Sequence, residues 1–429
     1  MANIVFVVGE YHPFFSAVGV CCRNIAEAIQ ADGHTVTVIC MKSRAGQLRA
    51  DRYQGERIVR VTTHSWSIRL WLEERIRRSA DIKGTWLRGL LSAWLHLLLN
   101  TLRVLGAMRS LSSKTSIDRA RVQAFLEGLA LVDEPIDLLI PLCFPMEAVV
   151  AGMEYADRHP RTRFVPYLFD PFVDSRTMHR TALNMRLKRR RHMAIEMQMM
   201  ARASRVFCVS HLMVHFRQYD RYAHKLVATE HPLLRKPVRT DPSRRVTSGR
   251  VNLVYAGVFD SRVRNPDYFL RVMLEVLPGF DGQLDLFVSG NCAKVIDMYC
   301  ESSGGRIRNH GYAPKEEVDC ALMSSDILVG VGNRGTSQVS SKIIEYASTG
   351  KPILYFFSEE EDPGCVVLQR YPLSSCLREE NRLFRENVRL VAGFCRSTAG
   401  DELDFADISR IYFEARPEFV AHKLLENVA

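Results

Sequence analysis

The sequence lacks the cysteine patterns that stabilise small secreted domains or bind zinc. Its 11 cysteines are odd in number, are scattered along the chain and include no Cys-x-x-Cys pair. Several of them, such as Cys40, Cys143 and Cys208, lie in apolar runs, as reduced and partly buried thiols do. Without a disulfide framework the chain suits a reducing compartment, so we expect a cytoplasmic protein.

The sequence also lacks the usual features of exported or membrane-spanning chains. Its first residues, MANIVFVVGEYHPFF, contain no basic leader and no small-residue cleavage site, so we expect a first strand and not a signal peptide. The uncharged run between Arg88 and Arg103 has 14 residues, whereas a membrane-spanning helix needs about 18 or more. We therefore expect this run to be too short to cross a bilayer.

Signatures of nucleic-acid and metal binding are missing as well. There is no RNA-binding sheet signature, no zinc finger and no interleaved basic and aromatic groove, so we expect no nucleic-acid partner. No Asp-x-Asp pair occurs, so we expect no essential metal. Yet 58 basic residues face 48 acidic ones, and this net charge of +10 favours anionic partners such as acidic lipid or a phosphorylated small molecule.

What the sequence does contain is a repeated alternation of short apolar runs and amphipathic stretches. It starts at Asn3–Glu10, a run typical of a buried parallel strand, and it restarts after Ser248 with VNLVYAG. Two such blocks predict two doubly wound α/β domains with a cleft between them. The polar, proline-containing stretch Arg235–Arg250 would join them.

Two basic segments interrupt or decorate this pattern. Residues 67–125 read as a helical insertion in the first domain, with Trp71, Trp86 and Trp94 placed among arginines. Such a segment suits a helix lying in a membrane interface, and it equally suits an ordinary insertion packed on the domain. The second segment, Met185–Met193, is interpreted as a solvated helix face, with binding of acidic lipid or nucleic acid as the alternative.

The stretch TSQVSSKIIEYASTGKPI (336–353) has an unusual order of polar residues. A helix starting at Ser340 or Ser341 would present free backbone N–H groups, two hydroxyls and Lys342 to an anion such as phosphate. Glu345 would lie one turn later on the face of Lys342. The spacing alone leaves two interpretations open: a surface ion pair, or a carboxylate that accepts the hydroxyls of a ribose while the helix start holds the attached diphosphate.

The stretch Asn333–Ile353 resembles the donor-site motif of bacterial glycosyltransferase family 4, whose members have the GT-B fold. The resemblance extends loosely over the chain: YAG…RNP resembles the start of the family's C-terminal domain, and FEARPEFVAHKLLENV resembles the helix that returns to its first domain. It implies an acceptor-binding domain at 1–238, a donor-binding domain at 239–408 and a crossing helix at 409–429.

Carried over to this sequence, the resemblance assigns roles to the donor-side residues. Glu345 would bind the ribose, Ser340, Ser341 and Lys342 would lie by the diphosphate, and Arg264, or failing that Arg262, would neutralise the leaving group, where charge must build. The remaining donor-side candidates are Gly257, Tyr312 beside the base, and Asn333 and Gln338 at the sugar or phosphate end. Two departures from the family stand out: Ser337 replaces a glutamate common in its members, and Gly257 is followed by Val258 where some members carry arginine.

Three residues of the first domain are candidates for the acceptor side. His12 and Gly19 lie in the loop after the first strand, where Gly19 would let the backbone approach a phosphate. His12 would contact an acceptor or a donor sugar, with a structural role as the alternative. Asp170 ends a later strand and could act as a base or orient the acceptor hydroxyl, although a turn residue before Pro171 explains it equally well.

Together these observations predict a glycosyltransferase. It would move a sugar from a nucleotide-diphosphate donor to a glycan or lipid-linked acceptor of the bacterial cell surface. The family resemblance implies that the sugar's configuration is retained. The protein's setting would be cytoplasmic, with peripheral contact to the inner membrane face. Two alternatives remain: a nucleotide-sugar epimerase of the same fold, and a catalytically silent partner subunit, which Ser337 keeps open.

Overall fold

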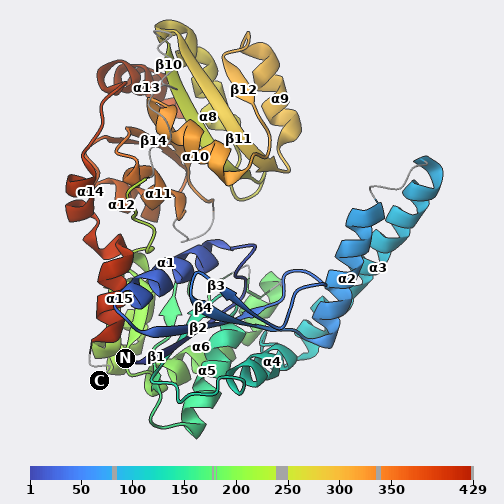
Figure 1. Ribbon diagram of the computed structural model, residues 1–429. Coiled ribbons are helices and arrows are strands. Elements are labelled where there is room, and N and C mark those ends of the chain that lie inside the picture. Colours follow the sequence, from blue (N-terminus) through green and yellow to red (C-terminus); the bar gives the residue numbers. More distant parts are fainter. Residues whose placement is uncertain (80–84, 176–177, 180, 238–249, 335–339, 427–429) are drawn as a thin grey trace. The chain divides into compact units, whose positions relative to one another are not determined.

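The computed structural model describes residues 1–79, 85–175, 178–179, 181–237, 250–334 and 340–426 (Figure 1). The chain divides into two compact units. The first unit comprises Met1–Pro232 and Pro417–Ala429, and the second comprises Leu233–Arg416. The chain passes from the first unit to the second after Pro232 and returns to the first after Arg416. The domain boundaries expected from the sequence were 238 and 408.

The first unit is built on a mostly parallel sheet in the order β3-β4-β2-β1-β5-β7-β8-β9, with β6 paired to β5. Among the strand pairs within the described residues of this unit, only β3–β4 is antiparallel. β1 and β5 are buried at every position, which explains why they read as continuous apolar runs and not as alternating ones. The strands are β1 (Asn3–Val8), β2 (Thr35–Met41), β3 (Ala50–Tyr53), β4 (Glu56–Val61), β5 (Leu138–Cys143), β6 (Arg163–Phe164), β7 (Tyr167–Leu168), β8 (Val206–Val209) and β9 (Leu226–Thr229).

Helices connect these strands, and several of them pack against the sheet. The N-cap of α1 is Ser16, whose hydroxyl accepts the backbone N–H of Gly19. The last helix, α15, belongs to the first unit and packs against α1. The helices are α1 (Ala17–Ala31), α2 (His64–Ser79), α3 (Thr85–Ser112), α4 (Arg119–Leu129), α5 (Met146–Arg158), α6 (Ala182–Arg202), the short α7 (Met213–Phe216) and α15 (Pro417–Leu425).

α2 and α3 pack side by side and form what we call the arm (Figure 1). α4, which the sequence assigned to the same insertion, instead belongs to the body of the unit, because Val122 and Phe125 are buried there. The expectation that the arm's apolar run is too short for a bilayer was also wrong. α3 continues through Arg103 and Arg109, and its segment Gly89–Ser112 is long and apolar enough to cross a membrane by length and composition.

The second unit contains a parallel sheet in the order β12-β11-β10-β13-β14-β15. Tyr255, Phe259, Phe269 and Phe356 contribute to its buried core. The strands are β10 (Val251–Phe259), β11 (Gly282–Gly290), β12 (Ile307–Asn309), β13 (Ile327–Val331), β14 (Ile353–Phe357) and β15 (Ser374–Arg378). The helices are α8 (Asp267–Val276), α9 (Ala293–Ser302), α10 (Lys315–Ser324), α11 (Lys342–Ser348), α12 (Pro363–Leu368), α13 (Phe384–Thr398) and α14 (Phe405–Ile411).

Each sheet reverses its winding once. In the first unit the chain winds from β1 through β2 to β4 and then returns to place β5 on the other side of β1. In the second it winds from β10 through β11 to β12 and returns to place β13 on the other side of β10. Ligands of open α/β sheets bind at the carboxyl ends of the strands beside such a reversal. Ligand-binding sites are therefore expected in the loops after β1, β5, β10 and β13.

Candidate functional site

The loops after β10 and β13 are fastened to one another at the reversal of the second sheet. Arg264, in the loop after β10, donates from Nη2 to Oδ1 of Asn333, which follows β13, at 2.8 Å. The backbone N–H of Arg334 donates to the carbonyl of Val263 at 2.6 Å. Two candidates that are 69 residues apart in the sequence are thus in direct contact.

A tight turn presents Arg264 at this position. Asp260 and Arg264 exchange both backbone hydrogen bonds, at 3.1 and 2.7 Å. The Asp260 carboxylate accepts the N–H groups of Arg262 and Val263, and these bonds lower the pKa of Asp260. Arg264 is half-buried while Arg262 is exposed, so the turn favours Arg264 over Arg262 as the cation of the site.

α11 is the helix predicted at Ser340 or Ser341. It begins at Lys342, with Ser341 as its N-cap residue, although the Ser341 side chain makes no capping bond. Tyr346 anchors the helix to β10, since its hydroxyl accepts the N–H of Ala256 at 3.0 Å and donates to the Ala256 carbonyl at 3.1 Å. Ser340, Ser341, Lys342 and Glu345 are all half-buried, and Lys342 donates to Glu345 at 2.6 Å.

The remaining donor-side candidates are less closely tied to this cluster. Tyr312 is 85% exposed and makes no hydrogen bond or ring contact within the described residues. A Cβ on Gly257 would lie 3.0 Å from the Tyr255 hydroxyl, so close packing by itself accounts for glycine there. Gln338 and Ser337 lie outside the described residues.

Sequence reasoning missed the residues that shape the back of this site. A Cβ on Gly332 would lie 2.7 Å from Oδ2 of Asp362, a buried residue that accepts the Tyr355 hydroxyl and caps α12. Arg334 donates at 2.6 Å to Glu379, whose pKa is raised by burial. These partners come from β14, α12 and the segment after β15, so no local pattern connects them to the donor motif.

In the first unit, His12 lies in the loop after β1, at the reversal of that sheet. Its ring stacks on Tyr53 with centroids 4.0 Å apart, and its carbonyl accepts from Arg60 at 3.1 Å. Burial, and then the charge of Arg60, lower the pKa of His12, so the imidazole is neutral near pH 7 and can accept a proton.

Gly19 is buried in the first turn of α1. A Cβ there would lie 2.4 Å from the carbonyl oxygen of Glu10. Glycine is therefore required here because α1 packs closely against the Glu10 carbonyl in the loop after β1. The predicted role of Gly19 beside a phosphate stays a prediction.

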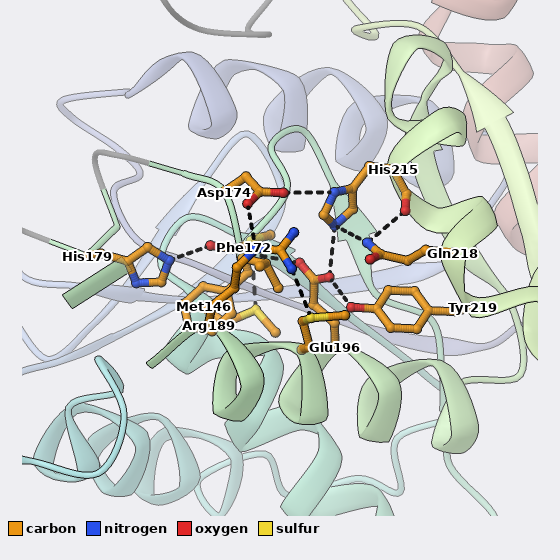
Figure 2. Close-up of polar contacts among 12 residues, drawn as sticks. Met146, Phe172, Asp174, His179, Arg189, Glu196, His215, Gln218 and Tyr219 are labelled. Carbon is orange, nitrogen blue, oxygen red and sulfur yellow. Dashed lines mark hydrogen bonds and ion pairs between the residues drawn. The ribbon is translucent and has the colours of Figure 1, made fainter. Parts of the chain in front are cut away.

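Asp170 is half-buried just after β7. The same unit contains a network of polar contacts (Figure 2). At the centre of this network is the buried Glu196 of α6, which accepts the N–H of Val173 at 3.0 Å and the Tyr219 hydroxyl at 2.8 Å. Its Oε2 also lies 2.8 Å from His215, whose other ring nitrogen is 3.4 Å from Asp174. No local sequence pattern predicts this network, because its members come from three separate segments.

The basic segment Met185–Met193 is only in part the solvated face that was expected. Lys188 is buried and donates to the carbonyl of Ser110, at the end of the arm, and burial lowers the pKa of Lys188. His192 is buried as well, and its Nε2 accepts the N–H of Ser116 at 3.1 Å. These side chains hold the arm to the unit, so a solvated helix face was the wrong interpretation for them.

No protein-family model matches the chain, and no curated protein matches it. Several solved structures match the chain. A sucrose-phosphate synthase from Thermosynechococcus elongatus matches with a TM-score of 0.63 at 13% identity, over 99% of this chain and 98% of its own. A UDP-forming α,α-trehalose-phosphate synthase from Burkholderia xenovorans, in complex with glucose-6-phosphate, matches with a TM-score of 0.62 at 9% identity over 100% of both chains. The chain has the GT-B fold.

This GT-B fold, expected from the donor motif, is confirmed over both units, because the matches run the full length of the chain. A UDP-GlcNAc 2-epimerase from Methanocaldococcus jannaschii has a similar likeness, with a TM-score of 0.57 at 8% identity over 99% of this chain and all of its own. The fold thus includes proteins named for sugar transfer and for epimerisation, and the choice between these depends on the site.

Proposed function

We propose that this protein is a glycosyltransferase that moves a sugar from a nucleotide-diphosphate sugar to an acceptor hydroxyl. The observation that carries the proposal is the contact of Arg264 with Asn333 across the reversal of the second sheet, together with the Lys342–Glu345 pair at the start of α11. Sheet reversals are where α/β folds bind nucleotides. In this chain the second sheet's reversal and the helix that follows it supply two cations, Arg264 and Lys342. They also supply the Asn333 amide and the Glu345 carboxylate, which belong to the donor motif.

Each of these groups has a task in the proposed reaction. When the bond between the anomeric carbon and the diphosphate breaks, negative charge builds on the leaving oxygen. Arg264 and Lys342 would stabilise that charge, and the hydroxyls of Ser340 and Ser341 would donate to the diphosphate. Glu345 would accept the two ribose hydroxyls, while Asn333 would hold Arg264 in position.

The first unit would supply the acceptor side. The acceptor hydroxyl must lose its proton as it bonds to the anomeric carbon, and His12 and Asp170 are the proposed groups for taking or orienting it. His12 suits this role because its lowered pKa keeps it neutral. The proposal includes retention of configuration, a cell-surface glycan or glycolipid acceptor, no essential metal, and a cytoplasmic location at the inner face of a membrane.

The test is a panel of nucleotide-sugars incubated with the full-length protein and a bacterial lipid-linked glycan fraction. We expect one donor to release its nucleoside diphosphate and the same diphosphate to raise the melting temperature. If no nucleoside diphosphate stabilises the protein, the donor site is refuted. Stabilisation without any transfer or hydrolysis would point instead to a silent partner subunit.

An epimerase is the second candidate, because an epimerase from Methanocaldococcus jannaschii shares the fold. The two activities separate in one measurement. An epimerase would convert its nucleotide-sugar to another nucleotide-sugar without any acceptor, which nuclear magnetic resonance of the sugar ring detects. A glycosyltransferase would leave the donor's sugar configuration unchanged until an acceptor is added.

A further inference from the structure

The arm formed by α2 and α3 starts at the edge of the first sheet that carries the candidate acceptor residues. α2 begins directly after β4, and the carboxyl ends of neighbouring parallel strands share one edge of a sheet. The base of the arm is firmly held: the Trp66 indole donates to the Lys42 carbonyl at 2.7 Å, and Asn184 donates to Ser110 at 2.9 Å. The arm is thus a built part of the first unit.

One face of α3 is apolar and exposed along its length. Its large apolar side chains, which we call the stripe, are between 55% and 63% exposed and recur with the helical period; they are Leu90, Trp94, Leu97, Val104, Leu105 and Met108. At 1.5 Å per residue the stripe is about 27 Å long. Thr101 falls within it, and its hydroxyl donates to the carbonyl of Leu97 at 2.8 Å, so this polar group is already satisfied.

The stripe is distinct from the face that α3 turns toward α2. That inner face is formed by Leu95 and Leu99, which are buried against Leu72. Within Gly89–Ser112, only 11% of the residues in an 18-residue apolar window are buried, whereas a core helix would be mostly buried. Monomeric soluble proteins rarely expose so continuous an apolar surface to water, so we expect the stripe to bind a partner.

The net charge of the arm indicates that this partner is anionic. Residues 64–112 contain eight Lys or Arg and three Asp or Glu, and α3 contains no acidic residue. At about 100° per residue, Arg109 falls about 90° to one side of the middle of the stripe and Arg103 about 150° to the other side. Neither has a carboxylate partner among the described residues. Trp71 of α2 is 48% exposed beneath Arg75, whose guanidinium lies 5.1 Å from its ring centroid.

We propose that the stripe lies in the surface of a bilayer containing anionic lipid. The six apolar side chains would enter the region of the acyl chains, and Arg103 and Arg109 would reach the lipid phosphates on either side. A second copy of the chain is a poorer occupant. Pairing two identical α3 helices would bring arginines together without any acidic residue of α3 to neutralise them.

This inference deepens the membrane part of the proposed function, and its test needs neither nucleotide nor acceptor. Flotation of the full-length protein would be measured with phosphatidylcholine vesicles, with and without about 30% phosphatidylglycerol. The variant L97E/V104E/M108E changes only exposed side chains of the stripe. Its matched control is V214E/M298E/V366E, which adds the same charge at exposed apolar side chains away from the arm.

We expect wild type and the control to float with the anionic vesicles and the stripe variant to bind at least about tenfold more weakly. R103Q/R109Q should lose about fivefold per arginine on anionic vesicles only. Equal binding of the stripe variant and wild type would overturn the proposal. So would a concentration-dependent dimer that the stripe variant abolishes in the absence of lipid, or resistance of the membrane-bound protein to alkaline extraction, which would indicate a spanning helix.

If vesicle binding is lost in the stripe variant while diphosphate binding persists, the two proposals are separable. If diphosphates fail to bind the wild type but vesicles still do, the donor site fails and the lipid surface stands.

Discussion

Lys342 and Glu345 form an ion pair at the start of α11, with Nζ of the lysine 2.6 Å from Oε2 of the glutamate. The structure therefore contains the surface ion pair that was one interpretation of this spacing. The pair does not decide against the other interpretation. It holds the carboxylate and the ammonium group one turn apart on one face of α11, as the proposed binding of a diphosphate and its ribose requires.

Glu345→Gln separates these interpretations. As an ion pair in partial contact with solvent, Lys342–Glu345 stabilises the fold by about 0.5 kcal/mol at most, so the free energy of unfolding should hardly change. Nucleoside diphosphate affinity, measured by calorimetry, should fall by about tenfold or more, because a buried ribose hydroxyl loses its charged acceptor. The control Asp319→Asn removes a comparable ion pair of α10, 3.0 Å long, and should leave affinity unchanged. Equal affinity of Glu345→Gln and wild type would refute the ribose role.

Arg264→Met should lower kcat by about 100-fold with a smaller change in the donor KM. The charge of Arg264 would matter most when negative charge develops on the leaving diphosphate. Arg264→Lys should recover part of the rate. Arg262→Met, which changes an exposed arginine of the same turn, should alter kcat by about twofold or less. Steady-state kinetics on the donor found in the panel would measure this, and a larger effect at Arg262 would contradict the assignment.

Glu56 makes stability depend on pH. It is fully buried, its Oε2 accepts the Tyr11 hydroxyl at 2.6 Å, and burial raises its pKa from 4.5 to about 7. Because the folded state holds this proton more tightly than the unfolded chain, its contribution is complete below pH 4.5 and is lost as the pH rises through about 7. Between pH 5 and 8.5, wild type should lose about 2 kcal/mol more stability than Glu56→Gln.

Chemical denaturation at the two pH values would measure this difference. The exposed Glu127→Gln in α4 serves as the control and should follow wild type. If Glu56→Gln loses as much stability as wild type over this range, the proton does not reside on Glu56.

Gly19→Ala should destabilise the first unit by about 2 kcal/mol or more. The added Cβ would lie 2.4 Å from the Glu10 carbonyl, so the loop after β1 or the start of α1 must move. Gly46→Ala, where a Cβ meets nothing within 4 Å, is the control. Urea denaturation would report the difference between the two variants. A Gly19→Ala protein as stable as the control would show that the loop yields freely.

Much of the fold was predictable because it follows from local pattern. The buried strands β1 and β5 are continuous apolar runs, and amphipathic stretches between strands form helices such as α1 and α5. The donor helix was found by its polar order, since hydroxyl, lysine and glutamate lie within one turn of each other. The β3–β4 hairpin was missed, because most of β3 is exposed and carries charged residues.

The sequence by itself determined two doubly wound units, a helix beginning near Ser340 or Ser341 and a basic, tryptophan-bearing insertion, because each depends on residues close together in the chain. Only the tertiary structure decided that Arg264 and not Arg262 meets Asn333, since that contact joins loops 69 residues apart. Only the tertiary structure also showed which apolar face of α3 packs on α2 and which is exposed. Hydrophobic periodicity marks a face as apolar, but only packing shows which face another helix covers and which is left for a different partner.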